Sequence, residues 1–278
     1  MTLVMGIVNV TPDSFSDGGR YLDAEAAVAH GLRLRGEGAD ILDVGGESTR
    51  PGAERIDPAL EQERAVPVVR ALAEAGCLVS IDTMNAGTAL AAVAAGARIV
   101  NDVSGGLADP ELLAAVAPTN ADVVLGHWRG PSAEMYAQAD YADVAAEVLG
   151  ELSRRVEAAA AAGIAPSRVI LDPGIGFGKR GDQNWAALHG TARLVRLGSR
   201  VLIGTSRKRF LAETLSEGDG SDVDEGRRDL ATAVTSVLAA QAGVWGVRVH
   251  DVAGTVDALR IARAWEGESR WASPTRSR

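Results

Sequence analysis

The stretch 78–103, LVSIDTMNAGTALAAVAAGARIVNDV, contains two short apolar runs separated by an alanine-rich segment. The runs Leu78–Asp82 and Arg98–Asn101 are continuously apolar rather than alternating, which is typical of parallel strands buried on both faces. The segment Ala86–Ala95 predicts the connecting helix, and Gly96 follows it where a helix-ending glycine is expected. This stretch therefore predicts a β–α–β unit.

The same unit recurs along the rest of the chain. Further strands are expected at Val4–Val10, Asp40–Val44, Asp122–Leu125, Arg168–Leu171, Arg200–Ile203 and Gly246–Val249. Further helices are expected at Ala24–Glu37, Pro58–Ala75, Tyr141–Ala162, Trp185–Leu197, Gly226–Ala242 and Thr255–Trp265. About eight units fit a (β/α)8 TIM barrel, which typically needs about 250 residues. An open doubly wound sheet is the alternative, but the absence of a linker or a composition break favours the closed barrel.

We expect a single α/β domain over residues 1–266. The remaining segment 267–278, GESRWASPTRSR, is polar and lacks periodicity, so we expect a disordered C-terminal tail. The acidic, glycine-rich segment Ser216–Glu225 is expected to be a mobile loop after the seventh strand, with no chemistry of its own.

Composition excludes several classes of protein. The 278 residues carry 28 Lys and Arg against 37 Asp and Glu, a net charge of −9, which argues against binding to nucleic acid. One cysteine, Cys77, excludes an internal disulfide and fits a reducing compartment. No apolar run reaches the roughly 18 residues that a membrane span needs, and the N-terminus lacks the features of a secretory signal. We therefore expect a cytoplasmic protein without a membrane or nucleic-acid partner.

Polar residues follow almost every predicted strand. They are Asn9, Asp43, Asp82, Asn101, Asp102, His127, Asp172, the run Ser206–Arg207–Lys208, Arg248 and His250. For a single strand end, a cap or a turn is an equally good interpretation. In a (β/α)8 barrel, however, the carboxyl ends of all strands surround one active site. Carboxylates and amides suit a polar heterocycle, and Lys208, Arg248 and His250 suit an anion.

Two expected connections are longer than usual. They are Thr11–Gly19, TPDSFSDGG, and Gly45–Asp57, GGESTRPGAERID. Long loops on the catalytic face of a barrel often act as lids or binding segments, although they can also be surface decoration. The segment Gly174–Lys179, GIGFGK, is not a Walker A loop, because the Gly-Lys-Ser/Thr ending is missing. The four histidines lack the spacing of a zinc-binding helix.

Seven motifs closely resemble the dihydropteroate synthase family. They are MGIVNVTPDSFSDGG (Met5–Gly19), LDVGGESTRPGA (Leu42–Ala53), SIDTMNA (Ser80–Ala86), NDVSGG (Asn101–Gly106), LDPGIGFGK (Leu171–Lys179), GTSRKRF (Gly204–Phe210) and VRVHDV (Val247–Val252). They occur in the order of the family, and the resemblance extends from about residue 3 to residue 265.

The resemblance implies a reaction in folate biosynthesis. Two small-molecule substrates, 6-hydroxymethyl-7,8-dihydropterin diphosphate and p-aminobenzoate, condense to 7,8-dihydropteroate and diphosphate, and Mg²⁺ is required. It places the pterin against Asp82, Asn101, Asp172 and Lys208. It places the diphosphate against Arg248, His250 and Arg50, with Asn9 as a ligand of Mg²⁺.

The resemblance also implies an SN1-like path, in which diphosphate leaves before the amine attacks. Asp13 then contributes to loop closure and to the environment of the pterin cation. The p-aminobenzoate site is expected to contain Thr49, Arg50, Pro51, Phe177 and Arg209. Asp13, Lys208, Arg248 and His250 are the expected catalytic residues, and no general base is assigned.

Two other functions are weighed against this one. A pterin-binding (β/α)8 methyltransferase would not need the STRPGA loop or the pair Arg248 and His250. A non-catalytic paralogue would be expected to lose Asp13, Arg50 or Lys208, which this chain retains. The family resemblance further suggests a homodimer through barrel helices, and the alanine-rich segments Ala231–Ala242 and Ala258–Ala264 would permit close packing.

Overall fold

Eight parallel strands close into a barrel in chain order, and β8 pairs with β1. The computed structural model describes residues 1–10, 20–48, 52–131, 136–218 and 220–267. The strands are β1 (Leu3–Asn9), β2 (Ile41–Gly45), β3 (Val79–Asp82), β4 (Ile99–Asp102), β5 (Asp122–Gly126), β6 (Val169–Asp172), β7 (Arg200–Ile203) and β8 (Gly246–Val249). The predicted (β/α)8 barrel is therefore confirmed, and the open sheet is excluded.

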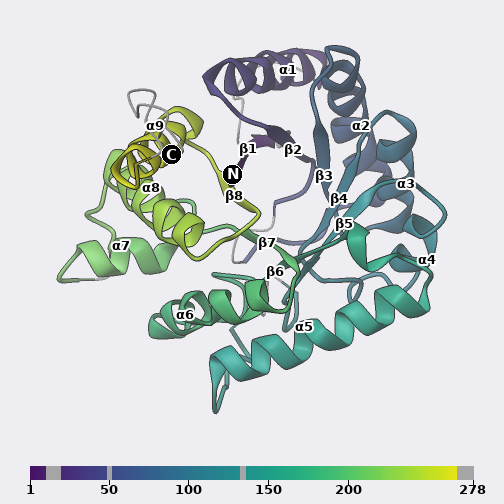
Figure 1. The fold of residues 1–278 in the computed structure, drawn as a ribbon. Coiled ribbons are helices and arrows are strands. Elements are labelled where there is room, and N and C mark those ends of the chain that lie inside the picture. The colour runs from purple at the N-terminus through teal and green to yellow at the C-terminus, as the bar shows by residue number, and fades with distance from the viewer. Residues whose placement is uncertain (11–19, 49–51, 132–135, 219, 268–278) are drawn as a thin grey trace, which may run out of the picture.

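Helices surround the barrel and connect its strands (Figure 1). They are α1 (Arg20–Glu37), α2 (Pro58–Glu74), α3 (Ala86–Ala94), α4 (Leu112–Val116), α5 (Val144–Ala161), α6 (Asp182–Arg196), α7 (Arg209–Leu215), α8 (Glu225–Gln241) and α9 (Val252–Trp265). A 3₁₀ turn, Pro166–Arg168, precedes β6. The short helices α4 and α7 are not among the helices expected from the sequence, because five to seven residues show too little periodicity.

Several helices begin at an aspartate whose side chain accepts a hydrogen bond from the backbone of the first turn. Asp57 caps α2, Asp143 caps α5, Asp224 caps α8 and Asp251 caps α9. Such caps satisfy amide groups that the helix itself leaves without partners. The cap at Asp143 also explains why α5 begins at Val144 rather than at the expected Tyr141.

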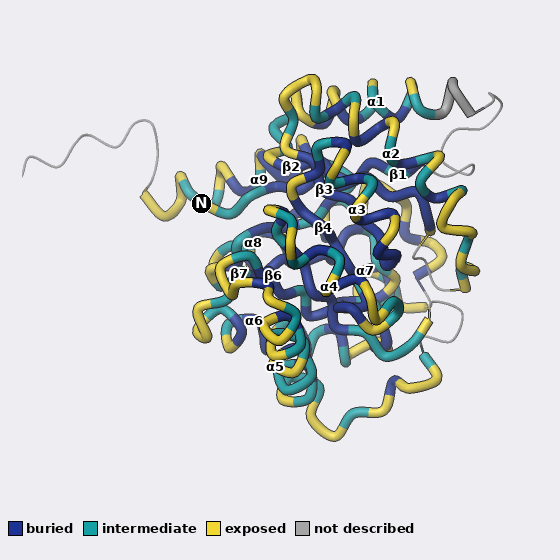
Figure 2. The backbone as a smooth tube through the Cα atoms, turned by 90° about the vertical axis from the view of Figure 1, so that its right-hand side faces the viewer, coloured by how far each residue is buried: buried dark blue, intermediate teal, exposed yellow. Residues whose placement is uncertain are grey.

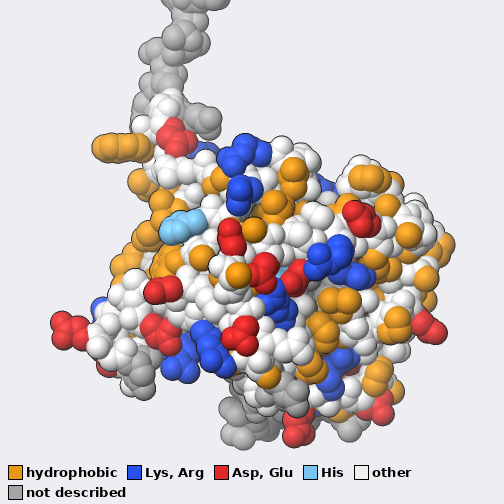
Figure 3. Space-filling model, turned by 90° about the horizontal axis from the view of Figure 1, so that it is seen from below, with side chains coloured by type: hydrophobic (Ala, Val, Ile, Leu, Met, Phe, Trp, Pro, Cys, Tyr) orange, Lys and Arg blue, Asp and Glu red, His pale blue; other side chains and the backbone are white. Residues whose placement is uncertain are grey.

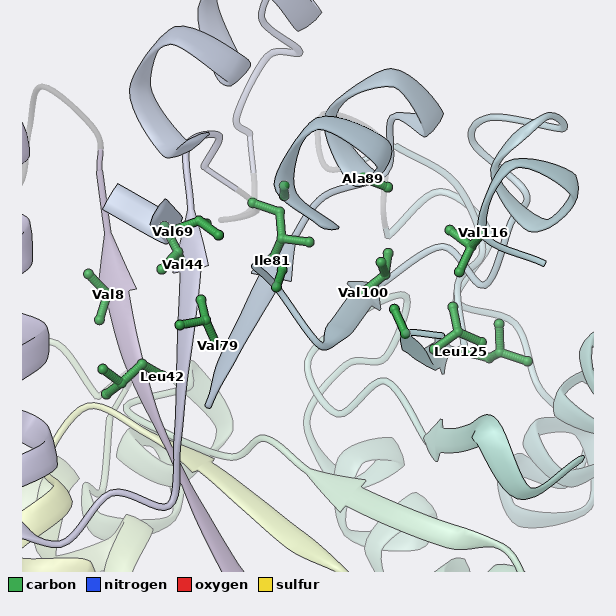
Figure 4. Packing of buried hydrophobic residues seen from close by; sticks show 14 of the residues in the cluster. Val8, Leu42, Val44, Val69, Val79, Ile81, Ala89, Val100, Val116 and Leu125 are labelled. Carbon is green, nitrogen blue, oxygen red and sulfur yellow. The ribbon is translucent and has the colours of Figure 1, made fainter. Parts of the chain in front are cut away.

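Strand residues alternate between two apolar layers. Outward-facing side chains such as Val8, Leu42 and Val100 belong to the large core between barrel and helices, part of which is drawn in Figure 4. Inward-facing side chains fill the lower barrel, and the fully buried members of that cluster are Met5, Ile41, Ile99, Val124, Ile170 and Leu202. Figure 2 shows the same arrangement, with buried strands inside a ring of helices whose outer faces are exposed.

The alternation of side chains along these strands determines which residues lie above the inward-facing apolar cluster. Counting two residues onward from Ile41, Ile99 and Ile170 gives Asp43, Asn101 and Asp172. Side chains two residues apart in a strand point to the same face. The inward positions therefore change from apolar to polar at the carboxyl end of the barrel, where an active site is expected.

One face of the molecule has a mixed surface. On the face seen in Figure 3, acidic and basic side chains are interspersed with apolar ones. No helix among the described residues is long and apolar enough to cross a membrane.

Candidate active site

A cavity of about 920 Å³ lies at the carboxyl ends of the strands. Of the polar residues expected at the strand ends, Asp43, Asp102 and His127 do not line it. Its lining does include every residue that the family resemblance assigns to the site and that the structure describes, namely Asn9, Asp82, Asn101, Asp172, Phe177, Lys208, Arg209, Arg248 and His250. These residues come from strand ends and loops scattered over most of the sequence. Closure of the barrel therefore brings them together as the sequence predicted.

The floor of the cavity is an arginine held between two carboxylates. Arg248 Nε donates to Asp43 Oδ2 at 2.6 Å, and another guanidinium nitrogen donates to Asp82 Oδ2 at 2.8 Å. Asn101 Nδ2 donates to the same Asp43 oxygen at 3.0 Å. Asp43 is fully buried beneath the cavity lining. The sequence marked Asp43 as a strand end but gave it no role, because its partners lie on strands distant in the chain.

Burial changes the ionisation of these acids. It raises the pKa of Asp82 to about 7, with the charge of Arg248 opposing the shift and that of Asp43 adding to it. Burial also raises the pKa of Asp172, against the attraction of Lys208. The two carboxylates raise the pKa of Arg248, although burial opposes them. The floor therefore holds a permanent positive charge beside acids that are costly to ionise.

Lys208 spans the other side of the cavity. Its ammonium donates to the carbonyl of Ile175 and lies 4.7 Å from the centre of the Phe177 ring. Burial lowers the pKa of Lys208 to about 8. Gly176 has a φ of +81°, and a Cβ there would lie 2.8 Å from Lys208 Cδ. The glycine therefore leaves room for the lysine to cross this loop.

His250 is held by a neighbouring strand end. Its Nδ1 lies 2.9 Å from Ser206 Oγ, and its backbone amide donates to the same oxygen at 3.0 Å. Ser206 lies in the loop after β7, so the hydroxyl connects that loop to the end of β8.

The cavity wall also contains a buried lysine that the sequence analysis did not single out. Lys179 is 1% exposed, and its ammonium lies 2.9 Å from the carbonyl of Gly174 and 3.1 Å from that of Phe177. Its third partner is His127 Nδ1 at 2.9 Å. Burial lowers the pKa of Lys179 to about 7 and that of His127 to about 4. The sequence feature that could have identified Lys179 is its place as the last residue of the GIGFGK motif.

The segment Ser216–Glu225 differs from the sequence interpretation. It follows α7 rather than β7, and its residues Val223 and Glu225 line the cavity. Asp13, Thr49, Arg50 and Pro51 lie outside the described residues, as do the whole segment 11–19 and residues 268–278 of the expected tail.

The stem of the second long loop is described on both sides of residues 49–51. Arg55 Nε lies 2.8 Å from Glu47 Oε1, and another of its nitrogens donates to Asn85 Oδ1 at 2.7 Å. Asn85 in turn donates to the buried Glu61 at 2.7 Å. These contacts fix the two ends of the loop above β2 and β3.

Comparison with known proteins gives the same assignment. The model of the family described as "Pterin binding enzyme" matches residues 5–250. Dihydropteroate synthase of Mycobacterium leprae is 54% identical over 263 residues, which cover 94% of this chain and 93% of that protein. The chain belongs to the dihydropteroate synthase family. The resemblance found in the sequence motifs is thereby confirmed.

Solved structures agree with this family in fold as well as in sequence. Dihydropteroate synthase of Xanthomonas albilineans with 4-aminobenzoic acid has a TM-score of 0.87 and 46% identity, covering 98% of this chain and 94% of that one. The same organism's enzyme in complex with 7,8-dihydropteroate has a TM-score of 0.83 and 43% identity, covering 98% and 95%. The similarity to dihydropteroate synthases therefore covers nearly the whole of both chains.

Proposed function

We propose that this chain condenses 6-hydroxymethyl-7,8-dihydropterin diphosphate with p-aminobenzoate, giving 7,8-dihydropteroate and diphosphate in folate biosynthesis. One observation carries the proposal: a single cavity combines buried carboxylates and an amide with an arginine, a histidine and a lysine. The first group suits the edge of a pterin, and the second suits a diphosphate.

The pterin would lie against Asp82, Asn101, Asp172 and Lys208. Carboxylates accept from ring N–H and amino groups, while the asparagine and the lysine can donate to ring nitrogen and carbonyl groups. Because these groups are buried, an analogue that leaves one of them without a partner would be rejected. Asp172 is already oriented, since one of its oxygens accepts from the backbone of Gly174 at 2.7 Å.

The diphosphate would lie against Arg248 and His250, with Arg50 approaching from the second loop. Arg248 and His250 are two residues apart, so both side chains reach the cavity. Positive charge at this end stabilises the negative charge that develops as the diphosphate departs.

Asn9 would supply one oxygen to Mg²⁺. It lines the cavity at the end of β1, and among the described residues no group of three or more acidic, histidine or cysteine side chains could hold a metal alone. A single amide oxygen from the protein fits Mg²⁺, because this ion commonly keeps waters and substrate phosphates as its other ligands. When bound, Mg²⁺ would neutralise part of the diphosphate charge.

The reaction would follow an SN1-like path. The bond between the pterin methylene carbon and the diphosphate oxygen breaks first, and its electron pair leaves with the diphosphate. The resulting cation is conjugated with the pterin ring and lies near the carboxyl groups of the floor and, from the first loop, Asp13. The amine of p-aminobenzoate then forms the C–N bond and loses a proton, which is acidic enough to need no strong base.

The aryl slot would be formed by Phe177, Lys208 and Arg209, completed by Thr49, Arg50 and Pro51. The Phe177 ring offers a flat apolar surface, and the Lys208 ammonium lies over that ring. Arg209 is exposed and can approach the aryl carboxylate, although it also pairs with Glu213 at 2.8 Å. Lys208 thus faces both substrates.

The chain would form a homodimer through α8 and α9. Leu230, Val234 and Leu238 follow one face of α8, and Ile261 and Trp265 follow one face of α9; each of the five side chains is at least half exposed. The two helices pack side by side, so their exposed apolar residues can form one surface. A second copy of the same surface would bury it symmetrically. A cytoplasmic location is part of the proposal, supported by the single cysteine.

The test is release of diphosphate from the dihydropterin diphosphate, with and without p-aminobenzoate, together with chromatography of the pterin product. We expect rapid release and formation of 7,8-dihydropteroate only when both substrates and Mg²⁺ are present. Absence of diphosphate release under both conditions would contradict the assignment.

A further inference from the structure

The loop after β7 is attached to α8 at alternate residues. Thr205 Oγ1 lies 2.8 Å from Thr235 Oγ1, and the backbone amide of Arg207 donates to Thr232 Oγ1 at 3.2 Å. Ser206, which lies between them, and the next two residues, Arg207 and Lys208, line the cavity. This short loop is therefore fixed to a helix at alternate residues and also carries groups of the site.

The Arg207 side chain makes the strongest of these attachments. Its Nε donates to Asp229 Oδ1 at 2.7 Å, and a second nitrogen donates to Asp229 Oδ2 at 2.9 Å. Such paired bonds fix the plane of a guanidinium. A third nitrogen lies 2.9 Å from Glu225, but the Glu225 side chain is 70% exposed against 15% for Asp229. Asp229 is therefore the better screened and better oriented partner.

The backbone at Arg207 has an unfavourable conformation that this attachment can hold in place. Its φ is +56°, and among the residues that the structure describes it is the one non-glycine residue with a positive φ. This left-handed region is unfavourable for residues with a Cβ, and such conformations persist when surrounding contacts hold them. A relaxed φ at Arg207 would turn the chain between Ser206 and Lys208.

We propose that Arg207 and Asp229 are positioning residues, which hold this left-handed turn so that Ser206 and Lys208 face the cavity. Ser206 Oγ then meets His250 Nδ1 at 2.9 Å, and the Lys208 ammonium reaches the carbonyl of Ile175 and the ring of Phe177. Arg207 lines the cavity and Asp229 does not, but the positioning role requires neither of them to touch a substrate. The inference rests on the proposed function, since turnover is its readout.

The first test is Asp229→Asn, which keeps the shape of the side chain but removes its charge. We expect kcat/KM for the pterin diphosphate to fall about ten- to a hundred-fold, the effect of a small misplacement of site groups. Asp257→Asn is the matched control, since Asp257 is a 75% exposed acid of α9. The thermal midpoint of Asp229→Asn should stay close to that of the control.

The second test separates the backbone from the ion pair. Arg207→Ala and Arg207→Gly both remove the guanidinium, but glycine adopts a φ of +56° without a steric penalty. We therefore expect Arg207→Gly to keep several-fold more kcat/KM than Arg207→Ala. An ion pair that only stabilises the fold predicts equal kcat/KM for the two folded variants, with a difference confined to their thermal midpoints.

The outcomes separate this inference from the proposed function. A wild-type protein without turnover would refute the function. A wild-type protein with turnover, whose Asp229→Asn variant has unchanged kcat/KM, would refute the positioning role. Should Asp229→Asn fail to fold, the pair of Arg207 variants decides: equal activities, or a more active alanine variant, overturn the inference.

Discussion

The guanidinium of Arg248 donates a 2.8 Å hydrogen bond to Asp82 across the floor of the cavity. We propose that Arg248 binds the diphosphate and that Asp82 binds the pterin. In the free protein, these two side chains therefore bind each other in place of the substrate groups. A single substrate carries both groups and can therefore replace both partners at once. Asp43, which also accepts from Arg248, lies below the cavity and can keep the arginine in place.

Arg248→Ala should weaken the binding of inorganic diphosphate by more than tenfold, because hydrogen bonds to charged groups contribute about 1.5–3 kcal/mol. Binding of 6-hydroxymethyl-7,8-dihydropterin without diphosphate should weaken much less. Calorimetry with the two ligands separates these effects, and Arg260→Ala on the exposed surface of α9 controls for net charge. Equal losses for both ligands would remove Arg248 from the diphosphate site.

Asp82→Asn should change how stability depends on pH. The folded-state pKa of Asp82 is about 7, against an ordinary value of 3.8, so the folded protein binds more protons than the unfolded chain between these values. The contribution of Asp82 to stability therefore decreases as pH rises from about 4 to about 7. Relative to wild type, Asp82→Asn should therefore gain stability progressively as pH rises over that window. Urea unfolding at pH 5 and pH 7 measures the gain, and a pH-independent difference would contradict it.

Asp172→Asn should weaken pterin binding by about ten- to a hundred-fold. The amide replaces one acceptor oxygen with a donor, and a buried group left without a partner costs about 1–3 kcal/mol. Calorimetric titration with the pterin measures this loss, and Asp122→Asn at the opposite end of the barrel is a suitable control. Unchanged pterin affinity would move the pterin to another part of the cavity.

The positions of the polar site residues could be predicted because they depend on one rule of topology. Once eight parallel strands were expected, the residues at their carboxyl ends had to surround one cavity, and Asp82, Asn101 and Asp172 do so. The pairing of Arg248 with Asp43 could not be predicted in this way. It depends on barrel closure, which places β8 and β2 on either side of β1, and on the reach of the two side chains, and no local pattern contains that information.

Residues inside the loops were harder still. Lys179 looks like a surface lysine after a glycine-rich turn, and its burial follows from carbonyls of the same loop and from His127, 52 residues earlier. No local sequence pattern predicts the left-handed backbone conformation of Arg207 either, because Asp229 on another element holds that conformation.

Leu238→Glu should convert a dimer into a monomer at micromolar concentration. The side chain lies in the exposed apolar row of α8, and a buried carboxylate without a partner would be strongly unfavourable in an interface. Light scattering measures the mass. Leu90→Glu on α3 is the control, since Leu90 is also partly exposed but lies on a different helix. A monomeric wild-type protein would refute the dimer.

The aryl substrate should bind only after the pterin diphosphate and Mg²⁺. Of the residues expected around p-aminobenzoate, Phe177, Lys208 and Arg209 are on described elements, and Arg209 has a 72% exposed side chain paired with Glu213. An exposed guanidinium that already has a partner contributes little affinity, so the rest must come from Thr49, Arg50 and Pro51 in the second loop. The diphosphate should draw that loop toward the cavity, because we propose that Arg50 binds the diphosphate as well.

Calorimetry should therefore detect weak p-aminobenzoate binding to the free protein and much tighter binding in the presence of the pterin diphosphate and Mg²⁺. Arg50→Ala should abolish that enhancement while leaving the affinity for bare pterin within about twofold, since Arg50 is not among the residues expected to bind the pterin. Tight binding of p-aminobenzoate without pterin would mean that the aryl site is already formed, and that the order of binding is not set by the loop.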